Sequence, residues 1–99
     1  MNELRMGVYR HYKGPLYQVI ALAHDADDEA RTCVIYIGLQ LDSAHIGPRM
    51  AVRSIEGFTE SVNADPDDPE YGKAVEHPSA LSTRRFKYLG PEFTPDMLG

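Results

Sequence analysis

The sequence predicts an all-β fold, a small barrel or curled sheet built from short strands. Short apolar and aromatic runs alternate with turn signals rich in glycine, proline and aspartate. No stretch has the spacing of a convincing amphipathic helix. At 99 residues with 42% hydrophobic residues, the chain is long enough for one small core and too apolar for wholesale disorder. We therefore expect a single domain over residues 1–99.

The first two strands are predicted to form a hairpin. Residues 7–13 read as one strand and residues 16–24 as the next, because Gly14-Pro15 between them favours a tight turn. Side chains alternate along a strand, so Tyr9 and His11 are expected to share a face.

The second strand and a third, residues 31–39, are apolar on both faces, which is typical of central strands. We expect them to pair antiparallel around residues 25–30, whose acidic side chains are too costly to bury and so form an exposed tip. Cys33 is the single cysteine of the chain, which excludes an internal disulfide, and is expected to be a small buried hydrophobe.

The second half of the chain is less regular. One segment is ambiguous between a strand and a helical turn, and we favour an irregular strand. A long segment rich in proline and acid buries too little to offset the entropy of ordering, so we expect a mobile loop. The expected elements are a loop at 40–48, a fourth strand at 50–54, the irregular strand at 54–62, the mobile loop at 63–84, a closing strand at 85–89 and a tail at 90–99.

The net charge of −5 argues against a dedicated non-specific nucleic-acid binder, which needs a concentrated basic face. The charges are nevertheless segregated, with acids at residues 25–29 and 65–70. If the cationic groups meet in the fold, they form a local cationic site. These groups are Arg10 and Lys13, then Arg49 and Arg53, then Arg84, Arg85 and Lys87.

Aromatic, cationic and imidazole side chains are concentrated near the start of the chain. His11 is suited to contact phosphate or transfer protons, tyrosines can stack on bases, and arginines suit phosphate or carboxylate. Three alternatives remain open. His11 is then an ordinary edge-strand histidine, and the cations pair with local acids. The tyrosines, Tyr17 among them, then belong to the core or the rim of the barrel. The candidate ligand-binding residues are Tyr9, Arg10, His11, Tyr12, Lys13, Tyr36, Arg53 and Arg85.

Other chemistry has little support in the sequence. The four histidines lack metal-ligand spacing, and neither a nucleophile elbow nor a phosphate-binding glycine loop is present. We assign no catalytic residue, metal ligand or cofactor. No signal peptide or membrane span is apparent, so a cytoplasmic protein is expected.

The opening run, Gly7 followed by Tyr9-Arg10-His11-Tyr12-Lys13-Gly14, then Tyr17 and Val19-Ile20, resembles the DUF1653 family of bacterial domains of unknown function. Weaker matches lie at Glu29, Val34-Ile35-Tyr36, Arg53, Phe58 with Glu60, and Arg85-Phe86. The resemblance implies a small SH3-like, partly open barrel of five or six strands, and implies no activity. This chain has Ala51 and Ser54 where the family usually has tryptophan and proline.

Three functions follow as expectations. The first is a binding module that holds an anionic ligand, such as a nucleic-acid segment, a nucleotide or an acidic peptide, on the Tyr/Arg/His face. The second is a protein-interaction or homodimer module, because the two apolar faces of the central strands exceed what one small core covers. The third is a small enzyme that uses His11 as acid or base; we consider a non-enzymatic role the better fit.

Overall fold

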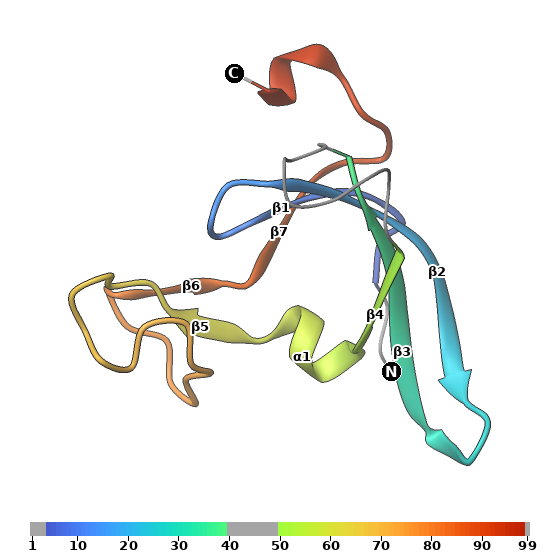
Figure 1. The fold of residues 1–99 in the computed structure, drawn as a ribbon, viewed down its shortest axis with the longest axis horizontal. Coiled ribbons are helices and arrows are strands. Elements are labelled where there is room, and N and C mark those ends of the chain that lie inside the picture. The colour runs from blue at the N-terminus through green and yellow to red at the C-terminus, as the bar shows by residue number, and fades with distance from the viewer. Residues whose placement is uncertain (1–3, 40–49, 99) are drawn as a thin grey trace.

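The computed structural model describes residues 4–39 and 50–98, and these form the predicted mostly-β, partly open barrel (Figure 1). Five strands make an antiparallel sheet in the order β4-β3-β2-β1-β7, and two short strands, β5 and β6, pair separately. The elements are β1 (Gly7–His11), β2 (Leu16–Asp25), β3 (Asp28–Gly38), β4 (Met50–Ser54), α1 (Ile55–Thr59), β5 (Ser61–Asn63), β6 (Ser82–Arg84), β7 (Phe86–Gly90) and the 3-10 helix η1 (Pro95–Leu98).

The predicted hairpins are present. β1 pairs with β2 across the Gly14-Pro15 turn, and β2 pairs with β3 across the acidic tip. The tip is exposed, and its acids serve the turn itself, since the Asp25 carboxylate accepts the backbone N–H of Asp27 at 2.9 Å. The expected loop at residues 40–48 lies outside the described residues.

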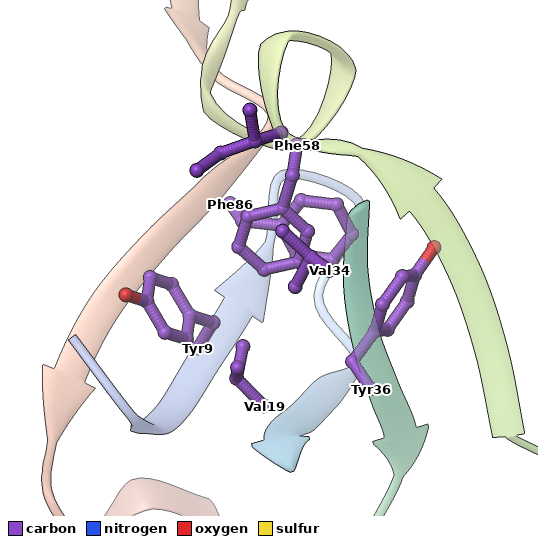
Figure 2. Packing of buried hydrophobic residues seen from close by; sticks show 7 residues of the cluster. Tyr9, Val19, Val34, Tyr36, Phe58 and Phe86 are labelled. Carbon is purple, nitrogen blue, oxygen red and sulfur yellow. The ribbon is translucent and has the colours of Figure 1, made fainter. Parts of the chain in front are cut away.

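The core lies on the inner face of the five-stranded sheet and is mainly aromatic (Figure 2). At its centre the Phe58 and Phe86 rings are stacked, with centroids 4.1 Å apart and planes 5° from parallel. Edge-to-face contacts join this pair to the surrounding tyrosines. The buried cluster consists of Tyr9, Val19, Val34, Tyr36, Ile55, Phe58 and Phe86.

The prediction of an irregular strand over residues 54–62 was wrong in its first part, which is helical. Ser54 caps α1, and its hydroxyl accepts the backbone N–H of Gly57 at 3.1 Å. Ile55 and Phe58, three residues apart on one helix face, are both buried in the core. Burial of this face stabilises a helix that is too short to persist alone.

The segment expected as a long loop contains an additional strand at its end, β6, which pairs with β5. Residues 64–81 between them follow a hydrogen-bonded path, with an isolated bridge from Val62 to Ala74. The acids cap local turns: Asp65 accepts from the Asp67 N–H, and Asp68 accepts from the Glu70 N–H. The β5–β6 pair and this loop extend away from the main sheet, to the left in Figure 1.

The outer face of the sheet is covered in one region and open in another. Val8 and Leu16 are fully buried there, and the Arg10 guanidinium donates to the carbonyl of Met97 in η1, which holds the C-terminal segment against β1. At the other edge of the sheet, Met50 and Val52 of β4 are 63% and 66% exposed. Cys33, expected to be buried, is half-buried.

Candidate functional site

Three predicted cations and His11 gather at one end of the core, together with three tyrosine rings. We call this group the cationic–aromatic cluster. The end of β1 contributes His11, and the three cations come from the β1–β2 turn, β4 and the residue between β6 and β7. Its members are His11, Lys13, Arg53 and Arg85 with the rings of Tyr12, Tyr17 and Tyr36.

His11 is the central member of the cluster. Its half-buried imidazole packs against the rings of Tyr12, Tyr17 and Phe86, with centroid distances of 4.5, 6.2 and 5.0 Å. Its Nδ1 accepts the backbone N–H of Lys13 at 3.1 Å, so the neutral ring carries its proton on Nε2.

The environment of His11 opposes a positive charge. Burial of the imidazole, together with the nearby charges of Lys13, Arg85 and Arg53, lowers its pKa from 6.5 to about 4, and burial is the largest of these causes. Near neutral pH the ring is therefore uncharged while three cations act on it. The cluster has the positive potential and the mixture of donors and rings that an anion requires.

Arg53 and Tyr36 lie side by side on β4 and β3. The Arg53 Nε donates to the Tyr36 hydroxyl at 3.3 Å, while the Tyr36 ring is buried in the core. Ala51 pairs with Tyr36 across the strands and so lies on the same face. Ala51 thus adjoins the cluster.

Arg85 has a counterion within the protein. Its guanidinium donates to the Glu60 carboxylate at 2.6 Å, and its side chain is only 16% exposed. The Nε atom is buried without a hydrogen-bond partner. Within residues 4–39 and 50–98, Lys13 and Arg53 pair with no carboxylate, so their charges remain available.

Tyr71 lies beside the cluster, although the sequence did not indicate it. It comes from the loop between β5 and β6, and its ring meets that of Tyr12 with centroids 5.8 Å apart. The Lys13 Nζ lies 5.8 Å from both ring centroids. Only the path of the loop brings Tyr71 here, and no local sequence signal predicts that path.

Two predicted site residues lie elsewhere. Tyr9 is buried in the core, because strand alternation puts it on the same inward face as His11. Its hydroxyl donates to the Arg5 carbonyl at 2.7 Å. Arg10 lies on the outer face, where it donates to the carbonyls of Gly14 and Met97.

Two other features are absent from the described part of the chain. No three His, Cys, Asp or Glu side chains there are grouped to hold a metal ion. No helix in the same residues has the length and apolar character needed to cross a membrane.

Comparison with known proteins agrees with this architecture. The crystal structure of a DUF1653 protein from Bordetella bronchiseptica is similar with a TM-score of 0.66 and 29% sequence identity, over 94% of this chain and 95% of that one. No curated protein matches the chain. The family model for DUF1653, a protein of unknown function, matches residues 7–88. The chain therefore belongs to the DUF1653 family.

Proposed function

We propose that this protein is a small binding module that holds an anionic ligand on the cationic–aromatic cluster. One observation carries the proposal: the half-buried, neutral His11 lies in the electrostatic field of Lys13, Arg53 and Arg85. Of these three cations, only Arg85 has a carboxylate partner among the described residues. A bound anion offsets this excess of positive charge.

The exposed edge of the cluster favours a nucleotide or a short single-stranded nucleic acid over an acidic peptide. Tyr71 is 37% exposed and Tyr12 is half-buried, so both rings are accessible for a base to stack on. Lys13 lies above both rings, where it meets the phosphate of a stacked nucleotide. An acidic peptide gains nothing comparable from these rings.

The number of available charges limits the expected affinity. With Arg85 neutralised by Glu60, Lys13 and Arg53 are the two free cations of the cluster. Two phosphate contacts to a single strand give a slope of about −1.4 for the logarithm of the binding constant against the logarithm of salt concentration. We therefore expect weak binding that is lost at high salt.

The test is an anisotropy titration of a labelled oligothymidylate with the wild type and with Arg53→Gln, at low and high salt. We expect Arg53→Gln to weaken binding about tenfold, because a charge-assisted contact is lost. Arg31→Gln is the matched control, since Arg31 is exposed near the tip of the β2–β3 hairpin. Absence of binding at low salt, or an equal loss in both variants, contradicts the nucleic-acid proposal; an oligoglutamate arm tests the acidic-peptide alternative.

A second candidate function, self-association, rests on the edge strand β4. Met50 and Val52 are exposed there, and their cross-strand partners Ile37 and Ile35 continue the apolar row on β3. Antiparallel pairing of two β4 strands centred on Val52 places Arg53 of each copy opposite Ala51 of the other, so like charges do not meet. Sedimentation of the wild type and of Val52→Glu tests this: a dimer abolished by the substitution supports it, and a monomer at high protein concentration contradicts it.

Catalysis by His11 has weaker support. An imidazole with a pKa of about 4 is a poor general base at neutral pH. Its contacts in the described residues are three aromatic rings and a backbone amide, none of which is an activated nucleophile. The geometry therefore favours binding over catalysis.

A further inference from the structure

A separate cavity of about 210 Å³ lies on the Tyr9 side of the stacked Phe58 and Phe86 rings. Figure 2 shows Tyr9 and Tyr36 on opposite sides of the Phe58 and Phe86 rings, so the two phenylalanines separate this cavity from Tyr36 and its neighbour Arg53. The cavity contains none of the available cations of the cationic–aromatic cluster. Its defining residues are Tyr9, Phe58, Phe86, Tyr88, Arg5 and Arg84.

The walls of the cavity are aromatic and held in place by one another. The Tyr9 ring meets those of Phe58 and Tyr88 edge to face, with centroids 5.2 and 5.3 Å apart. The Tyr9 hydroxyl donates to the Arg5 carbonyl at 2.7 Å, which ties the segment before β1 to the cavity. Aromatic walls of this kind make their best contacts with a planar ring of a ligand.

Two guanidinium groups border the same cavity. Arg5 lies over the Tyr88 ring, 5.2 Å from its centroid, and Arg84 is exposed at the end of β6. Both also act on the Tyr9 hydroxyl, whose pKa is nevertheless raised because burial and the neighbouring Tyr88 outweigh them. Neither arginine pairs with a carboxylate within residues 4–39 and 50–98. Two unpaired cations beside a hollow favour an oxyanion.

The volume limits the ligand to one ring. A cavity of about 150 Å³ accommodates benzene, whereas pockets for drug-sized ligands start at about 300 Å³. At about 210 Å³, this cavity has room for a six-membered ring with one substituent.

We propose that this cavity is a binding site for a single-ring aromatic compound bearing one oxyanion group, with the ring between Tyr9, Tyr88 and the stacked phenylalanines and the oxyanion at Arg5 and Arg84. The oxyanion is a carboxylate or a phosphate, since guanidinium binds either. A free cation is a poor ligand here, because both arginines repel it.

The test is an NMR titration of the full chain with benzoate, phenyl phosphate and, as a neutral analogue, benzyl alcohol. We expect saturable shifts of the amide signals of Arg84 and Tyr88, with at least one anion binding about tenfold more tightly than benzyl alcohol. The ratio of the benzoate and phenyl phosphate affinities identifies the preferred group. Equal binding of all three compounds, or no saturable shift at these residues, overturns the proposal.

Matched variants assign the charge that is responsible. Arg84→Gln is expected to reduce the ratio of anion affinity to benzyl alcohol affinity to about one third of its wild-type value or less. Lys87 is exposed on β7 and outside the cavity lining, so Lys87→Gln is expected to leave this ratio unchanged. Benzoate binding is expected to survive Arg53→Gln, and oligothymidylate binding to survive Arg84→Gln. Loss of benzoate binding in Arg53→Gln, with Arg84→Gln unaffected, overturns the proposed site.

Discussion

Phe58 of α1 and Phe86 of β7 stack with their planes 5° from parallel, whereas the other ring pairs around them meet edge to face or tilted. This pair joins the helix to the edge strand of the sheet. Tyr36, a member of the cationic–aromatic cluster, contacts both rings, and Tyr9, which lines the separate cavity, contacts Phe58. The stack therefore supports both candidate sites.

Truncation of either phenylalanine is expected to destabilise the fold substantially. Phe86→Ala or Phe58→Ala removes a buried ring and should lower the free energy of unfolding by about 3–5 kcal/mol. The milder pair Phe58→Leu and Phe86→Leu, alone and combined, should show a coupling of about 0.5–1.5 kcal/mol in urea denaturation. Additive effects would show that the stacked geometry contributes nothing beyond burial.

Gly7 is expected to tolerate no side chain. Its φ is +140°, and a Cβ there would lie 2.3 Å from the Gly90 carbonyl oxygen, where β1 and β7 adjoin. Because that atom is backbone, Gly7→Ala should destabilise the protein by about 3 kcal/mol or more, measured by urea denaturation. Gly14→Ala is the control: its φ is also positive, at +114°, but no atom lies within 4 Å, so only backbone strain applies. Equal losses would contradict the steric account.

The Arg85–Glu60 ion pair is expected to oppose anion binding while it stabilises the fold. Glu60→Gln leaves a largely buried guanidinium without its counterion, which should cost about 1–3 kcal/mol of stability. The same change frees the Arg85 charge, so oligothymidylate should bind severalfold more tightly in the anisotropy assay. Glu29→Gln, at the exposed hairpin tip, should change neither quantity. Weaker or unchanged binding in Glu60→Gln would exclude Arg85 from the site.

His11 gives the protein a defined acid sensitivity. Its pKa is about 4 when folded and ordinarily 6.5, so between these values the unfolded chain binds a proton that the folded protein does not. Stability is therefore expected to fall as the pH drops from 6.5 to about 4, by about 1 kcal/mol for this half-buried ring partly screened by solvent. His11→Gln should remove that part of the pH dependence of the urea midpoint, whereas exposed His24→Gln should retain it. An unchanged slope in His11→Gln would contradict the burial of His11.

Much of the main sheet was predictable because its signals are local. Period-two alternation and the Gly14-Pro15 turn place β1 and β2, and the acidic tip places the β2–β3 hairpin. Helix α1 was missed because its five residues are too few to show a helical period, and its stability depends on the Ser54 cap and on burial of Phe58. Strand β6 was missed, and only the first two residues of β5 fell within the expected irregular strand, because each strand is three residues long and exists only through a long-range pairing.

The candidate site was predictable in part for the same reason. His11 and Lys13 are neighbours in sequence, and Arg53 and Arg85 lie where strands were expected. Strands β4 and β7 are opposite edges of the five-stranded sheet, so the approach of the two arginines depends on the curl of the sheet rather than on strand order. Tyr9 was assigned to the site although its inward direction places it in the core. Tyr71 and the pair Arg5 and Arg84 depend on where irregular segments pack, which alternation and composition do not specify.

The most direct test of the anion-binding account is the pKa of the His11 imidazole, measured by NMR from its ring protons with and without saturating oligothymidylate. Bound phosphate offsets the charges of Lys13, Arg53 and Arg85, so the account predicts that the pKa rises from about 4 toward its ordinary 6.5. An unchanged His11 titration in the saturated complex would contradict it, because the ligand would then be bound away from the cationic–aromatic cluster.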